Sequence, residues 1–124
     1  MRRLTDEGFT LIELMITLVV LSLGLLALAG LQVSAIKANA VSKRMTVATA
    51  VADATIEQLK DTPYANVISE AATAVTAGAM TFTRQVTVTA NSPTANTKTI
   101  QVVVSWTQGT RTYTVPLTTI MSQL

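Results

Sequence analysis

The sequence predicts an α+β protein in which one long N-terminal helix packs against a small antiparallel sheet of three strands. Residues 14–36 form a stretch of 23 uncharged, mostly apolar residues, and no Gly or Pro occurs between 32 and 60. The last third of the chain alternates apolar and polar residues with a period of two, as strands with one buried face do. A three-stranded sheet needs a partner for its apolar face, and the helix is the only long element available.

The 124 residues divide into five predicted segments. We expect a short polar leader at 1–8, a membrane-length half of the helix at 9–36, a second helical half at 37–60, a connecting loop at 61–79 and a strand-rich head at 80–124. Thr62-Pro63 ends the helix, because the residue before a proline disfavours the α conformation. Within the loop, residues 69–74 could form a short turn of helix.

The helix is long enough to cross a membrane and continue beyond it. At a rise of about 1.5 Å per residue, the uncharged stretch alone spans roughly 35 Å, close to the thickness of the hydrocarbon layer. Beyond it, apolar residues recur at near-helical spacing: Ile36, Ala40, Val47, Val51, Ala54 and Leu59. Half of the helix should therefore lie in lipid and half should project into the periplasm.

Three segments of alternation predict the three strands. Their apolar faces are Phe82, Val86, Val88 and Ala90, then Ile100, Val102, Val104 and Trp106, then Tyr113, Val115 and Leu117. Arg84 is an exception on the first apolar face. Residues 91–96 are predicted to be a loop and Gln108-Gly109 a tight hairpin. Pro116 lacks a backbone donor, which places the third strand at an edge of the sheet or leaves that side unpaired.

Composition excludes several kinds of function. The chain has neither Cys nor His, which removes disulfides, thiolate metal sites, the commonest general base and the commonest metal ligand. We therefore expect no enzyme, no cofactor, no metal and no small-molecule substrate. The net charge is only +2 and the basic residues are scattered along the sequence, so no cluster suited to several phosphates is visible and nucleic acid is not a favoured partner.

Glu13 is the one acid at the edge of the apolar stretch, where a carboxylate is costly. It could serve assembly, it could reach the headgroups as an interfacial acid, or it could favour the helix dipole together with Asp6 and Glu7. Gly24 and Gly30 lie inside the apolar half and each costs about 1 kcal/mol against Ala. They are candidates either for close packing between helices or for local unwinding in an assembly.

Two other interpretations of the N-terminus remain open. A secretory signal peptide could be cleaved behind Ala27-Leu28-Ala29, although Glu13 and the helical pattern that continues past Ile36 argue against it. A simple uncleaved anchor would have Arg2 and Arg3 holding the N-terminus in the cytoplasm.

Residues 3–31, with Gly8-Phe9-Thr10-Leu11-Ile12-Glu13 followed by the apolar stretch, resemble the N-terminus of type IV pilins and type II secretion pseudopilins. The resemblance implies cleavage after Gly8 by a prepilin peptidase on the cytoplasmic side, followed by N-methylation of Phe9. It also implies that Glu13 of one subunit meets the new amine of Phe9 on its neighbour. The implied partners are the prepilin peptidase/N-methyltransferase, other major and minor pilins, inner-membrane lipid and the pilus assembly platform.

Further segments are similar to minor pilins of the PilV type, the type IV pilus modification proteins: residues 23–32, 52–59, 103–107 and 111–120. Major pilins usually carry a proline where Gly30 stands and often a C-terminal disulfide loop, and this chain has neither. The resemblance therefore favours a minor subunit. It would be anchored in the inner membrane with its N-terminus in the cytoplasm and its C-terminus in the periplasm, and after assembly it would be part of the pilus on the cell surface.

Three functional interpretations follow. The first is a minor pilin that primes, caps or modifies a type IV pilus and so supports adhesion, twitching motility or DNA uptake. The second is a minor pseudopilin of a type II secretion system, which would share the anchor and the fold. The third is a membrane-anchored module that binds DNA or a surface, for which Arg84, Lys98 and Arg111 are the only basic residues available on the sheet.

Overall fold

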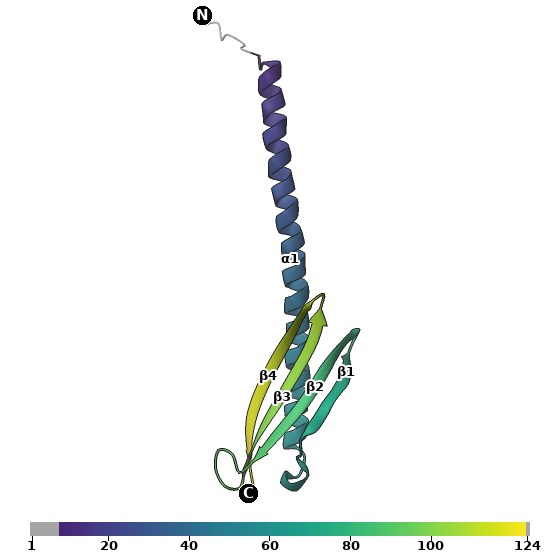
Figure 1. Cartoon of the computed structure of the whole chain (residues 1–124), viewed down its shortest axis with the longest axis vertical. Coiled ribbons are helices and arrows are strands. Elements are labelled where there is room, and N and C mark those ends of the chain that lie inside the picture. Colours follow the sequence, from purple (N-terminus) through teal and green to yellow (C-terminus); the bar gives the residue numbers. More distant parts are fainter. Residues whose placement is uncertain (1–7, 124) are drawn as a thin grey trace, which may run out of the picture. The chain divides into compact units, whose positions relative to one another are not determined.

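The computed structural model describes residues 8–123, which form one long α-helix, one short 3-10 helix and four strands (Figure 1). The elements are α1 (Leu11–Lys60), η1 (Tyr64–Asn66), β1 (Glu70–Ala77), β2 (Met80–Ala90), β3 (Thr97–Gln108) and β4 (Arg111–Ser122). The chain divides into two compact units between Ala40 and Val41. The predicted leader, 1–8, lies outside the described residues except for Gly8.

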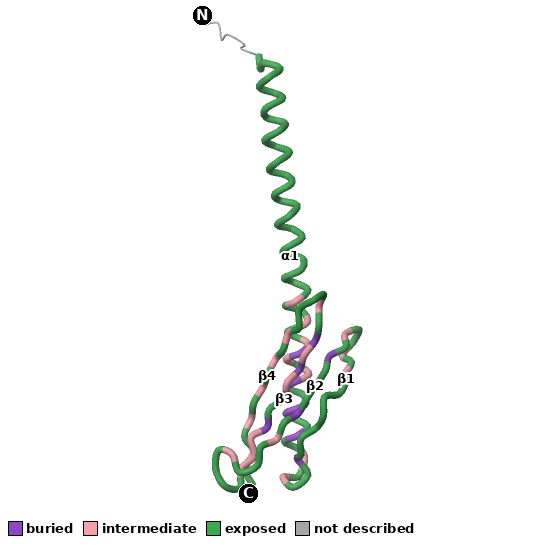
Figure 2. Tube along the Cα trace, viewed as in Figure 1, coloured by how far each residue is buried: buried purple, intermediate pink, exposed green. Residues whose placement is uncertain are grey.

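The first unit presents apolar side chains on every side of its helix. The large apolar residues from Leu11 to Ile36 are 53–76% exposed, and Figure 2 shows no buried position in this part of α1. Within residues 8–123, α1 is the one helix long and apolar enough to cross a membrane. A helix that is apolar all round needs lipid or other helices around it.

Two of the three hydroxyls inside this apolar stretch, those of Thr17 and Ser22, are compatible with lipid because they bond to their own helix. Thr17 Oγ1 donates to the carbonyl of Glu13 at 2.6 Å, and Ser22 Oγ donates to the carbonyl of Leu18 at 2.7 Å. These two hydroxyls therefore have an acceptor, whose absence would be costly in hydrocarbon.

In the second unit, which begins at Val41 and is called the head from here on, the rest of α1 packs on one face of the sheet. Its buried residues are Ala48, Ala52, Thr55, Ile56 and Leu59. The predicted apolar stripe is correct at Leu59, which is buried, and nearly so at Val47 and Val51, which are half-buried against the core. It is wrong at Ala54, which is exposed. Ala48 and Ala52 belong to the same buried cluster as Phe82 and Trp106 of the sheet.

The four strands form one antiparallel sheet in the order β1-β2-β3-β4. Both tight hairpins have a two-residue loop that begins with glycine at positive φ, Gly78 (φ 60°) and Gly109 (φ 63°). A type II′ turn requires this conformation at its first residue. The hairpin at Gln108-Gly109 was predicted, and Pro116 lies on the edge strand β4 as predicted.

The sheet has four strands, not the three that were predicted. The segment 61–79 is not simply a loop, because it contains η1 and all of β1, and the helical turn suggested for residues 69–74 is wrong. Four of the eight residues of β1 are alanine, which is depleted in strands, so its local preference is weak. Pairing with β2 makes this segment a strand.

The apolar faces predicted for the other three strands are confirmed except at Ala90, which is exposed. The residues predicted for β4 are half-buried and pack against the core, as does Val88 of β2. Phe82, Val86, Ile100, Val102, Val104 and Trp106 are all buried beneath α1. Trp106 stacks on Tyr113 with ring centroids 5.3 Å apart, and Phe82 meets Trp106 edge-on at 5.8 Å. Such pairs contribute about 0.5–1.5 kcal/mol each beyond the area they bury.

Lys98, at the start of β3, fastens the segment after α1 to the sheet. Its Nζ donates to the carbonyls of Tyr64 at 2.6 Å and Val67 at 2.9 Å, and it lies 4.4 Å from the centroid of the Tyr64 ring. Hydrogen bonds from a charged donor are worth more than neutral ones. Lys98 therefore stabilises the head by binding groups inside it.

We expect Lys98→Met to lower the free energy of unfolding of the head by about 2 kcal/mol, because two carbonyls lose a charged donor. A urea titration of the chain in detergent, followed by fluorescence of its single tryptophan, Trp106, measures this. Lys60→Met is the matched control, since Lys60 makes only an exposed pair with Glu57 and should cost no more than about 0.5 kcal/mol. Equal unfolding midpoints for the two variants would contradict the assignment.

Candidate processing and assembly site

The apolar helix begins with a side-chain cap. The backbone N–H of Glu13 donates to Thr10 Oγ1 at 3.3 Å, and the N–H of Leu14 donates to the carbonyl of Thr10 at 3.1 Å. Thr10 is thus the N-cap residue of α1, and Glu13 stands three positions later, the spacing of a capping box. The cap fixes Gly8 and Phe9 outside the helix and Glu13 in its first turn.

Gly8 and Phe9 lie in accessible, non-helical backbone. Phe9 is 84% exposed, and a Cβ added at Gly8 would meet nothing within 4 Å. Gly8, Phe9, Thr10 and Glu13 together line an open hollow of about 290 Å³. The first turn therefore brings the predicted cleavage residues and the predicted assembly acid to one place.

Glu13 is exposed and makes no ion pair within residues 8–123. Its neighbours in the first two turns are exposed apolar residues such as Ile12 and Ile16. A carboxylate at the edge of an apolar helix is favoured only weakly by the helix dipole, so a cation from outside the helix would stabilise it more.

Gly24 and Gly30 do not interrupt α1, which continues through both. A Cβ at either glycine would meet nothing within 4 Å, so neither is required for packing inside this chain. The roles predicted for them, contact between helices and local unwinding, both concern an assembly and stay predictions.

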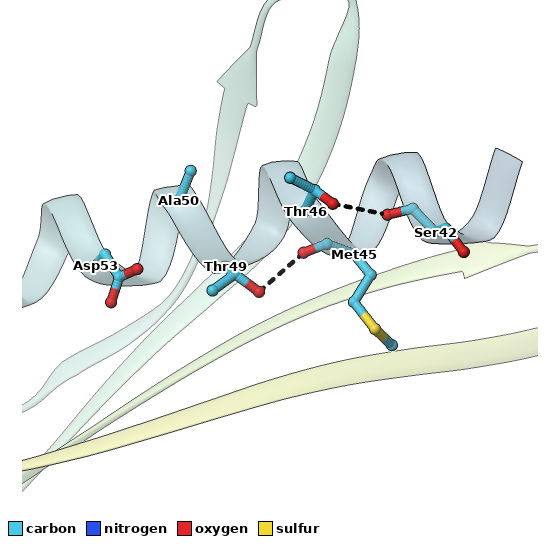
Figure 3. Close-up of a pocket in the computed structure, with 6 residues that line it drawn as sticks. All are labelled: Ser42, Met45, Thr46, Thr49, Ala50 and Asp53. Carbon is cyan, nitrogen blue, oxygen red and sulfur yellow. Dashed lines mark hydrogen bonds between the residues drawn. The ribbon is translucent and has the colours of Figure 1, made fainter. Parts of the chain in front are cut away.

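A second hollow, of about 530 Å³, lies along the second part of α1 (Figure 3). Two of its hydroxyls bond to their own helix: Thr46 Oγ1 donates to the carbonyl of Ser42 at 3.1 Å, and Thr49 Oγ1 donates to the carbonyl of Met45 at 2.9 Å. Asp53 is its one acid. A single carboxylate with no paired base provides no acid–base or nucleophilic arrangement.

The described residues contain no group of three or more acids that could hold a metal ion. Two of the three basic residues considered for a DNA-binding stripe, Arg84 and Lys98, bind other groups within the head. Arg84 Nη2 donates to Glu70 Oε2 at 2.7 Å, and Lys98 binds the carbonyls of Tyr64 and Val67. The sheet therefore offers no row of available cations for phosphates.

Sequence reasoning missed two of these features. Thr10 was seen only as part of the motif, although its spacing from Glu13 is a capping signal that sequence alone provides. The pairing of Arg84 with Glu70 required knowing that residues 70–77 form a strand beside β2.

Residues 4–29 match the family model described as the prokaryotic N-terminal methylation motif. Comparisons with curated proteins and with solved structures gave no match. The matched range includes Gly8, Phe9, Thr10 and Glu13, the residues that line the hollow at the start of α1.

The match and the fold support a protein of the type IV pilin or pseudopilin kind that is made as a prepilin. A prepilin motif implies processing by a prepilin peptidase and assembly with other pilins, and pilin-like proteins are generally structural, not enzymatic. The apolar first part of α1 fits the single-pass membrane anchor of such a protein. No comparison tests the PilV-type resemblance.

Proposed function

We propose that this chain is a minor pilin, a structural subunit that primes, caps or modifies a type IV pilus after its leader has been removed. The match of residues 4–29 to the methylation motif carries the proposal. The departures from major pilins at Gly30 and in the lack of cysteine favour a minor subunit.

The first step is cleavage between Gly8 and Phe9, followed by methylation of the new amine of Phe9. A protease groove takes an extended backbone, and residues 8–10 are not helical. Gly8 allows the backbone a close approach because it has no side chain. The cap at Thr10 marks the point from which the chain stays helical.

The second step is pairing of the positive amine of Phe9 with Glu13 of a neighbouring subunit. An acid within the membrane costs about 2.5–3.5 kcal/mol on insertion scales, and a cation in contact relieves that cost. Since relief requires the neighbour in the correct register, the pair selects register as well as adding stability. The apolar helices would then pack side by side as the core of the fibre.

The subunit would wait in the inner membrane with its N-terminus in the cytoplasm and its head in the periplasm. It would leave the lipid when the pilus assembly platform adds it to the fibre. Adhesion, twitching motility and DNA uptake are the activities that such a fibre supports.

A clean deletion, complemented by the wild-type gene, tests the proposal when surface fibres, motility and secretion are scored in parallel. We expect fewer fibres or altered fibre function, with secretion unchanged and both restored by complementation. Loss of secretion with normal fibres would replace the proposal with a pseudopilin of a type II secretion system, which uses the same motif. Unchanged fibres and motility would contradict it.

A further inference from the structure

The second unit has a division among its six cations: Lys60, Arg84 and Lys98 lie near its four acids, and Lys43, Arg44 and Arg111 lie away from them. After Glu13, every acid of the chain falls within residues 53–70, and none follows Glu70. Lys43 and Arg44 precede this range on α1, and Arg111 begins β4. Sequence position alone hides the division, because Arg111 is far from Lys43 and Arg44 along the chain.

The antiparallel course of α1 and β3 brings these three cations to the same end of the head. Lys98, near the start of β3, bonds to Tyr64 and Val67, which follow the end of α1. The ten steps from Lys98 to Gln108 extend about 33 Å along the strand. Going back along α1 from Lys60 to Arg44 covers about 24 Å. The β3–β4 hairpin therefore ends beside the first turns of the part of α1 that belongs to the second unit, which begins at Val41 (Figure 1).

We call Lys43, Arg44 and Arg111 the basic end of the head. Lys43 and Arg111 are exposed and Arg44 is half-buried. None of the three makes an ion pair within residues 8–123, whereas Glu57 and Glu70 are paired with Lys60 and Arg84. The basic end thus has cations available to a partner, whereas Lys60, Arg84 and Lys98 already have partners within this unit.

We propose that the basic end binds the headgroups of anionic phospholipids and holds the head against the membrane before assembly. The proposal rests on the membrane anchor of the proposed function. The apolar stretch ends at Ile36, seven residues before Lys43, and seven residues span less than about 25 Å even when fully extended. Lipid phosphates are then the closest dense negative charge, and each surface cation favours anionic lipid by about fivefold.

The test uses the full chain in vesicles of phosphatidylcholine alone or of an equimolar mixture with phosphatidylglycerol. Because the chain has no cysteine, Thr110→Cys places a single fluorophore at the hairpin. Energy transfer to a headgroup-labelled lipid reports the ratio of docked to undocked heads. We expect more transfer in the anionic vesicles, an effect that high salt removes.

Lys43→Gln and Arg111→Gln should each lower the docked-to-undocked ratio by about fivefold in anionic vesicles and leave it unchanged in neutral ones. Lys60→Gln, which removes the same charge from the opposite end, should have no effect. A label at Ala95→Cys, in the loop between β2 and β3, should not respond to lipid charge.

Equal transfer in both kinds of vesicle, or no effect of the two substitutions, would overturn the inference. If these substitutions reduce fibre assembly in cells without changing transfer in vesicles, the basic end binds a protein and the lipid proposal is wrong. Flotation of the chain with the vesicles distinguishes a failure of the docking inference from a failure of the proposed membrane anchor. A chain that floats but does not dock contradicts only this inference, whereas a chain that does not float contradicts the anchor itself.

Discussion

Glu13→Ala should leave the leader cleaved and reduce incorporation of the subunit into fibres by about tenfold or more. Removing the carboxylate abolishes the pair with the neighbouring amine of Phe9, and each 1.4 kcal/mol lost from an interface is about a tenfold change in equilibrium. The amine is then left at the membrane without its partner, which adds to the cost. Immunoblots of sheared fibres and of the membrane fraction measure incorporation and cleavage separately.

Two variants show whether charge is the cause. Glu13→Gln keeps the size of the side chain but removes its charge, so it should assemble as poorly as Glu13→Ala. Glu57→Gln removes an acid that is exposed on the second part of α1 and should assemble normally. Wild-type amounts of the Glu13→Ala subunit in sheared fibres would sink the pairing account.

Gly8→Val should stop processing, so that the precursor accumulates and almost no mature subunit forms. A branched side chain restricts the backbone next to the cleaved bond and obstructs its entry into the peptidase groove. The fold should be unaffected, because a Cβ at Gly8 would meet nothing within 4 Å. An immunoblot that separates precursor from mature chain measures the effect.

Gly30→Ala is the matched control for this substitution. It also fills open space in the chain, but it lies inside the helix and away from the cleavage residues. We expect normal processing of Gly30→Ala. Normal processing of Gly8→Val as well would remove the role assigned to Gly8.

The helix and three of the strands were predictable because their signals are local. The apolar stretch and Thr62-Pro63 predicted a helix over 9–60, and α1 covers Leu11–Lys60. Period-two alternation identified the buried faces of β2, β3 and β4. β1 was missed because alanine carries little strand preference, although Gly78 followed by Ala79 is the kind of dipeptide that a type II′ hairpin uses.

The face of α1 that meets the sheet could not be read correctly from the sequence. Alanine and valine occur all round this part of the helix, so several stripes are equally apolar. The stripe through Ala48 and Ala52 is the one that joins the buried cluster with Phe82 and Trp106. Which face of α1 is buried therefore depends on packing against residues that are distant in the sequence.

The residues of the candidate site could be predicted from the sequence, whereas the hydrogen bonds and ion pairs elsewhere in the structure could be predicted less well. Gly8, Phe9 and Glu13 came from the motif, and the structure adds the cap at Thr10 that places them around one hollow. The ion pair of Arg84 and the contacts of Lys98 depend on strand pairing and loop geometry. Neither set of contacts could be predicted from the positions of the charged residues in the sequence.

Mass spectrometry of the native polypeptide tests most directly whether a processed amine exists to neutralise Glu13. The account predicts a chain that begins at Phe9 and carries one methyl group on its α-amine. A chain that still begins at Met1, or one that begins behind Ala29, would contradict it, because neither leaves an amine at Phe9 for the carboxylate of a neighbouring subunit.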